Sequence, residues 1–185
     1  MTYGTQVGGY SSAAKLLHWL IALCVLAILP VAWWMNNTTN QELGGQLYTV
    51  HKSLGMTILI LMTLRIVYRL AAGAPAAYAG LNRLEKALSS AVHGLLYLLL
   101  FLMPLVGWVA NSAYGMKTPF WGLFEFPQII AKNEALSERL FTLHKYVGWV
   151  VAAVVVLHVA GALKHYVIDR DGVLQRMLPR SLGGI

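Results

Sequence analysis

The stretch that decides the fold is residues 140–165, LFTLHKYVGWVVAAVVVLHVAGALKH. It is long and apolar enough to cross a bilayer as a helix, which takes about 20 residues. Two histidines, His144 and His158, stand fourteen residues apart in it. In an α-helix this spacing is close to four turns, so both imidazoles point roughly the same way, ~21 Å apart along the axis. One helix that offers the same ligand at two depths predicts two stacked cofactor sites, with bis-histidine haem as the leading candidate.

The composition of the whole chain is typical of a membrane protein. Of the 185 residues, 58% are hydrophobic and only 11% are charged, whereas soluble domains carry about 25% charged residues. The net charge of +7 fits cytoplasmic membrane loops, and no basic stretch interleaved with aromatics favours nucleic-acid binding. The single cysteine, Cys24, excludes a disulfide or an iron–sulfur cluster within the chain. We expect one domain over residues 1–185 without a cleavable signal peptide.

Three further apolar runs complete a four-helix pattern. Together with the first stretch they predict spans at residues 13–35, 53–70, 88–110 and 140–165, each near the length that a membrane helix needs. Aromatic residues gather at the span ends, as membrane interfaces favour. The sequence therefore predicts an all-α integral membrane four-helix bundle with up-down-up-down topology.

The distribution of lysine and arginine predicts the orientation of this bundle. Basic residues are concentrated around the connection at residues 71–87 and in the C-terminal tail: Arg65, Arg69, Arg83, Lys86, Lys164, Arg170, Arg176 and Arg180. The other two connections carry few charges or balanced ones. By the positive-inside rule, we expect both termini and the second connection in the cytoplasm.

This orientation sorts the histidines by depth. At the outer level the only natural pair is His51 with His144. At the inner level we prefer His18 with His158, because His158 shares a helix face with His144 and the first span supplies His18. Ionisable residues at membrane depth are costly and usually functional, so four that form two height-matched pairs predict two ligand sets.

Two more histidines leave the inner pair less determined than the outer one. His93, on the third span, competes with His18 as the inner ligand opposite His158. His165 lies lower, at the inner interface.

The propionate groups of a haem would need cationic partners. Arg65 and Arg69 lie toward the inner end of the second span, and Lys52 lies at its outer start. Arginine is well suited to a carboxylate, which it binds through two parallel hydrogen bonds. Glycines one helical turn from a histidine would leave space for a flat macrocycle or allow close helix packing: Gly55, Gly148 and Gly161.

Along nearly its whole length the chain resembles the bacterial cytochrome b561 family, on motifs that occur in the family's order. These are Leu17-His18-Trp19, His51-Lys52-Ser53-Leu54-Gly55, Arg65-Ile66-Val67-Tyr68-Arg69-Leu70, His93-Gly94-Leu95-Leu96-Tyr97, Pro104-Leu105-Val106-Gly107, His144 through His158, and Arg176-Met177-Leu178-Pro179-Arg180. The resemblance implies a four-helix protein of the bacterial inner membrane with two haem b groups. It implies His18 with His158 as inner ligands and His51 with His144 as outer ligands, the same pairs that depth matching favours.

The resemblance also implies an activity, in which electrons pass from periplasmic superoxide through the haems to ubiquinone, as in a superoxide oxidase. Cationic side chains could steer the superoxide anion to the outer face: Lys52, Lys117, Arg139 and Lys145. His93 and His165 are candidates for a proton relay on the quinone side, because histidine titrates near neutral pH.

Two other functions stay open. The chain could be a cytochrome b subunit that links a partner dehydrogenase or hydrogenase to the quinone pool, docking through residues 111–139. It could also be a haem-free transporter or scaffold, which predicts no visible absorption.

Overall fold

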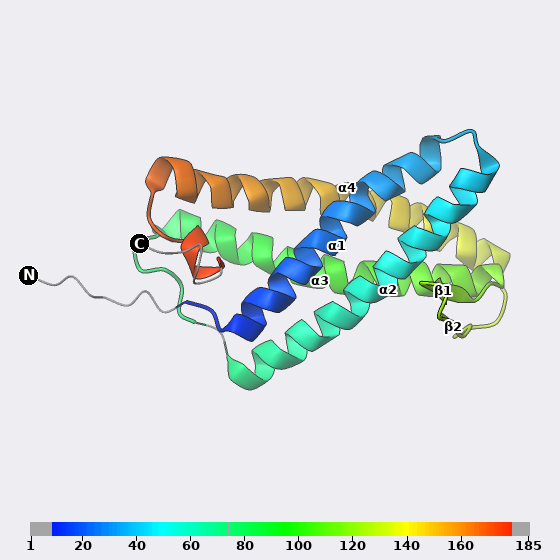
Figure 1. Ribbon diagram of the computed structural model, residues 1–185, viewed down its shortest axis with the longest axis horizontal. Helices are drawn as coiled ribbons and strands as arrows, with labels where there is room; N and C mark the ends of the chain where they lie inside the picture. The colour runs from blue at the N-terminus through cyan, green and yellow to red at the C-terminus, as the bar shows by residue number, and fades with distance from the viewer. Residues whose placement is uncertain (1–8, 74, 179–185) are drawn as a thin grey trace, which may run out of the picture.

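The computed structural model describes residues 9–73 and 75–178, so Pro179 and Arg180 of the C-terminal motif lie outside the described residues. It contains four long helices, each long and apolar enough to cross a membrane: α1 (Ser12–Asn37), α2 (Gln41–Ala72), α3 (Arg83–Tyr114) and α4 (Glu134–Lys164) (Figure 1). A π-helical turn, His165–Asp169, continues α4, and a 3-10 turn follows at Leu174–Arg176. The predicted all-α membrane bundle is confirmed.

Each helix begins at a polar cap. The capping residues are Ser11, Asn40, Asn82 and Asn133. In every case the side chain accepts a hydrogen bond from the backbone N–H three residues further on, which satisfies a donor that the helix itself leaves free. The caps lie outside the apolar runs, so the helices are longer than the spans expected from hydropathy. The difference is largest for α2, which begins at Gln41 rather than near residue 53. An apolar run marks only the part of a helix that lies in hydrocarbon, whereas the helix itself continues into the interface.

The helices form two hairpins. α1 packs along α2 and α3 packs along α4, and the hairpins meet mainly where α2 packs on α3. A small apolar cluster joins α1 to α2: Ile21, Val25, Ile58 and Met62. Among the described residues α4 makes no comparable backbone contact with α1 or α2. Side chains must therefore bridge the space between α4 and the first hairpin.

A short β-hairpin follows the C-terminal end of α3, in the connection between α3 and α4. Gly115, in the left-handed conformation with φ of 98°, ends α3. Strand β1 (Thr118–Phe120) then pairs antiparallel with β2 (Phe124–Phe126), through a turn in which Trp121 and Gly122 both have positive φ. The hairpin packs on α2 (Figure 1). The sequence predicts no strands within residues 111–139.

Candidate cofactor site

The half of the bundle away from the start of α1, which we expect to be the outer half, brings the ring of His51 of α2 next to that of His144 of α4. The centroids of their rings lie 6.0 Å apart, with the ring planes at 75°. The Nδ1 atoms of both rings are buried without a hydrogen-bond partner among the described residues. On the third helix, Gly107 lies directly against the His144 ring, since a Cβ atom added there would come 3.1 Å from Cε1.

The inner half brings three histidines together. His18 of α1 and His158 of α4 have ring centroids 6.1 Å apart, with planes at 73°. The His93 ring of α3 lies 5.1 Å from that of His158. Its Nδ1 lies 2.6 Å from the backbone oxygen of Ser89. Because a carbonyl oxygen can only accept, Nδ1 carries the proton and only Nε2 of His93 is left for other contacts.

The spacing of the rings tests whether a metal fits between them. Bonds from a metal to an imidazole nitrogen are about 2 Å long, so two rings on opposite sides of one metal have centroids roughly 6 Å apart. The His51–His144 and His18–His158 pairs match this spacing at 6.0 and 6.1 Å. The His93–His158 separation of 5.1 Å is too short for such a linear arrangement.

Space is also free around three glycines that lie close in sequence to a histidine, as it is around Gly45 of α2. A Cβ atom added at any of three glycines in the bundle would meet no atom within 4 Å: Gly55, Gly94 and Gly161. Two of them, Gly55 and Gly161, are among the three glycines expected to leave such space. Together with the unpartnered imidazole nitrogens of the outer pair, this makes the donor set suitable for bis-histidine haem.

His165 is not part of the inner group of histidines. Its Nδ1 lies 2.6 Å from Oδ2 of Asp171 and 3.0 Å from Oδ2 of Asp169. Lys164 bridges Asp169 and Glu85 at 2.6 and 3.0 Å, which ties the end of α4 to the start of α3. His165 therefore belongs to an ionic cluster at the inner end of the bundle.

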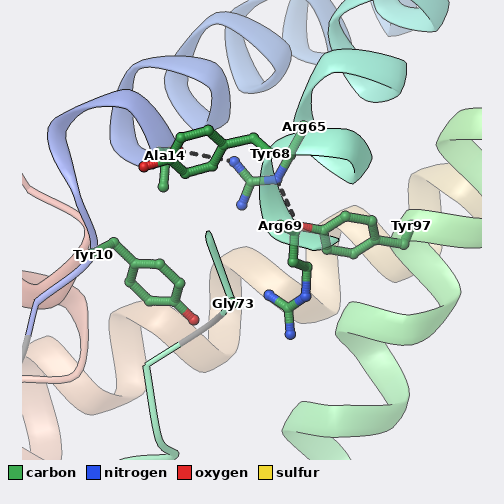
Figure 2. Close-up of a pocket in the computed structure, with 7 residues that line it drawn as sticks. All are labelled: Tyr10, Ala14, Arg65, Tyr68, Arg69, Gly73 and Tyr97. Atoms are coloured by element: carbon green, nitrogen blue, oxygen red, sulfur yellow. Dashed lines mark hydrogen bonds between the residues drawn. The ribbon is translucent and has the colours of Figure 1, made fainter. Parts of the chain in front are cut away.

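The two arginines of α2 both lie on the ring of Tyr97, a residue of α3. Arg65 donates from Nε to the Tyr97 hydroxyl at 2.9 Å and from Nη1 to the backbone oxygen of Ala14 at 3.0 Å (Figure 2). The guanidinium carbon of Arg69 lies 5.4 Å from the centroid of the Tyr97 ring. Arg65 thus connects α1, α2 and α3 one helical turn from His18.

At the outer end, two lysines directly follow the histidines in sequence, Lys52 after His51 and Lys145 after His144. In the part of the chain that the structure describes, neither forms an ion pair, whereas Lys117 lies 3.8 Å from Glu125. Lys52 is half-buried and Lys145 is exposed. The outer histidines are therefore flanked by uncompensated positive charge.

Sequence reasoning missed the packing of Gly107 and the contacts of Ser53. The Ser53 hydroxyl accepts from the backbone N–H of Trp121 at 2.9 Å and donates to the oxygen of Pro119 at 3.3 Å, which fixes the β-hairpin two residues from His51. Gly107 and Ser53 both occur in motifs of the resemblance, but nothing in the sequence says what they contact.

A four-helix membrane bundle whose histidines meet in facing pairs defines the class of membrane b-type cytochromes. The family described as "Prokaryotic cytochrome b561" matches residues 9–180. The chain therefore belongs to the prokaryotic cytochrome b561 family, whose members bind haem b.

Curated relatives match over almost their whole length. "Cytochrome b561 homolog 2" of Escherichia coli (strain K12) is 29% identical, over 98% of this chain and 97% of the relative. "Probable superoxide oxidase CybB" of Yersinia pestis is 28% identical, over 94% of this chain and 98% of the relative. "Cytochrome b562" of Cereibacter sphaeroides is 27% identical with the same coverage. The chain is thus a membrane electron carrier of this family and a multi-pass protein of the bacterial inner membrane.

Proposed function

We propose that this protein is a di-haem b cytochrome that takes electrons from superoxide at the periplasmic face and delivers them to ubiquinone. The observation that carries the proposal is that two histidines of α4 each lie beside a histidine of another helix. The ring centroids are 6.0 Å apart in the pair with α2 and 6.1 Å apart in the pair with α1. The similarity to a relative named as a probable superoxide oxidase supports the choice of donor.

In this proposal, His51 with His144 would hold the outer haem, and His18 with His158 would hold the inner one. Bound haem supplies a reversible one-electron couple. Arg65 and Arg69 are the candidates for the inner propionates and Lys52 for an outer one. His93 and His165 stay candidates for the quinone side.

The overall reaction balances with the partners named. Two superoxide anions give two molecules of oxygen and two electrons, and these electrons with two protons convert one ubiquinone to ubiquinol. Superoxide oxidation consumes no proton, so the outer face needs no acid or base. It does need attraction for an anion, and Lys145, which is exposed and follows His144 directly, supplies positive charge for it.

The test is the rate at which superoxide reduces the purified holoprotein. Replacing Lys145 by glutamine should slow this reduction about threefold at low salt, because steering by charge raises association rates. The difference should shrink as salt rises, since the Debye length falls from about 30 Å at 0.01 M to about 3 Å at 1 M. Lys132→Gln is the control, because it removes one charge of the outer loop that is already paired with Glu134 at 2.8 Å. Wild-type protein whose haems superoxide does not reduce would refute the proposal.

A second candidate function rests on the outer loop. Its β-hairpin region exposes large apolar side chains: Met116, Trp121, Leu123, Phe124 and Ile129. Such a patch could dock a partner dehydrogenase or hydrogenase, in which case the chain is an electron-transfer subunit. This function predicts haem reduction by the partner's substrate only when the partner is present, and no reduction by superoxide.

A further inference from the structure

The β-hairpin of residues 118–126 lies beside α2 and α3 rather than beyond their ends (Figure 1). A hydrogen bond fixes the depth of its turn on α2, because the Trp121 indole donates to Oγ1 of Thr57 at 3.0 Å. Thr57 follows His51 by six residues, a rise of ~9 Å along the helix. The apolar run of α2 begins at residue 53, so the turn of the hairpin lies at a level that we expect inside the membrane.

The second strand of the hairpin reaches a similar depth on α3. The Trp108 indole donates to the backbone oxygen of Pro127 at 3.0 Å, and the rings of Trp108 and Phe126 have centroids 5.4 Å apart. Trp108 directly follows Gly107, which lies against the ring of His144. The segment after β2 therefore lies at the level of the outer histidine pair, within the expected span at residues 88–110.

Side chains of the membrane helices bond the backbone of this segment. Ser53 bonds the N–H of Trp121 and the oxygen of Pro119, and Oγ of Ser112 accepts from the N–H of Ile129 at 3.3 Å. A segment outside a helix can leave water only where its backbone donors and acceptors find partners in the protein. The hairpin meets this condition at its contacts with α2 and α3.

The side chains that the turn leaves uncovered are large and apolar. Leu123 is 77% exposed, and its neighbours Trp121 and Phe124 are 47 and 52% exposed. Glu125 is paired with Lys117 at 3.8 Å, which offsets the one charge next to these side chains. Tryptophan is enriched at the interface between lipid and water, where its ring contacts lipid and its N–H finds a polar partner. The composition of the turn is therefore typical of a membrane interface.

The surface of α2 continues the apolar surface of the turn. Ile60 and Leu64 are both exposed and follow Thr57 by three and seven residues, which places all three on one face of the helix. Because α2 is a membrane-spanning helix, this face contacts lipid. A partner protein that covered the turn would have to enter the bilayer, whereas lipid already lies beside it.

We propose that the turn of this hairpin is inserted into the lipid leaflet at the end of the bundle away from the start of α1, with Trp121, Leu123 and Phe124 in contact with acyl chains. The bilayer itself, rather than a partner protein or a second copy of the chain, then covers the apolar patch. The hairpin thus anchors the connection between α3 and α4 in the membrane beside the outer histidines. The inference holds for any electron donor, and it excludes docking of a partner dehydrogenase on these three side chains.

The experiment uses purified Cys24→Ala holoprotein in nanodiscs of phosphatidylethanolamine and phosphatidylglycerol, so that an introduced cysteine is the only one in the chain. A water-soluble sulfonated maleimide reacts with the thiolate, which lipid disfavours. Leu123→Cys should react at least about tenfold more slowly than Lys132→Cys, the matched control, whose side chain is 61% exposed in the same connection. Leu64→Cys gives the rate for a thiol that faces lipid. If Leu123→Cys loses haem, Phe124→Cys replaces it with the same expectation.

A second readout identifies the molecule that covers the turn. A phospholipid that carries a diazirine in its acyl chain should form adducts with residues 121–124 of the wild-type holoprotein in the same nanodiscs. Equal maleimide rates for Leu123→Cys and Lys132→Cys, or no lipid adduct on these residues, would overturn the inference. A second copy that covered the turn would also slow the maleimide, but Leu123→Cys would then form disulfide-linked dimers and carry no lipid adduct, which would overturn the inference as well.

Discussion

At the residue scale, Gly107 sets the position of His144, a proposed ligand of the outer haem. A Cβ atom at this residue would come 3.1 Å from Cε1 and 3.4 Å from Nδ1 of the His144 ring. Both atoms belong to a ring rather than to the flexible end of a side chain. The hydrogen in place of a side chain therefore lets α3 and α4 approach until the ring of His144 rests on the backbone of α3.

Replacing Gly107 by alanine should displace this ring and disturb only the outer haem. We expect a changed low-spin electron paramagnetic resonance signal or partial loss of one haem, with a destabilisation of about 1–3 kcal/mol from overpacking. Gly45→Ala is the control, because nothing lies within 4 Å of a Cβ atom there. A Gly107→Ala protein with both haem signals and the haem content of the wild type would show that the glycine has no such role.

The histidine pairs were predictable at this scale and the glycine was not. A spacing of fourteen residues and the depth of each histidine follow from helix geometry and hydropathy, which are properties of the sequence. The contact between Gly107 and His144 depends on the rotation of α3 about its axis. Among the expected spacer glycines, Gly148 differs from the other two, because a Cβ atom added there would lie 4.0 Å from the methyl group of Met103.

At the scale of elements, one hydroxyl anchors the outer β-hairpin. Ser53 is completely buried and bonds both Trp121 and Pro119 of the hairpin. The Trp121 indole also donates to Oγ1 of Thr57 at 3.0 Å, one helical turn further along α2. The hairpin is thus held to α2 next to His51.

Ser53→Ala should loosen the hairpin, because it leaves the Trp121 N–H and the Pro119 oxygen without their partner. The expected cost is about 1–3 kcal/mol. Hydrogen exchange at residues 118–126 should become faster, while the rest of the chain is unaffected. Thr49→Ala is the control, since the Thr49 hydroxyl bonds only the backbone of its own helix at Gly45. Equal exchange rates in Ser53→Ala and wild type would refute the anchoring role.

The helices were predictable as elements, whereas the hairpin was not. The apolar runs of about twenty residues identify the four spans, but the strands have only three residues each. Such short strands carry no alternating pattern. The turn between them depends on Trp121 at φ of 51°, a left-handed conformation that is uncommon for a residue other than glycine and cannot be predicted from the sequence.

At the scale of the whole molecule, hydrogen bonds connect the C-terminal segment to α1. Trp19 donates from Nε1 to the oxygen of Met177 at 2.9 Å, and Lys15 donates to the oxygen of Leu178 at 2.6 Å. The C-terminal segment therefore folds back onto the start of α1. Because the chain crosses the membrane four times, the start of α1 and the end of α4 lie on one side (Figure 1).

We expect this side to be cytoplasmic, because the basic residues gather there. Alkaline phosphatase fused at the C-terminus should be inactive in cells, and a green fluorescent protein at the same position should fluoresce. Phosphatase inserted after Gln128 in the outer loop should be active. An active C-terminal phosphatase fusion would reverse the orientation and, with it, the assignment of an outer and an inner site. Hydropathy predicted the four spans, but only the folded chain could show that Tyr10, Tyr68 and Tyr97, from segments far apart in sequence, line one recess.

The central claim is that four histidines hold two haems, and haem counting tests it most directly. Pyridine haemochrome analysis of pure protein should give two haem b per wild-type chain. His51→Ala and His144→Ala should each lose the same haem, His18→Ala and His158→Ala should each lose the other, and His93→Ala should keep both. Retention of two haems in any of the first four variants, or one haem in the wild type, would contradict the account.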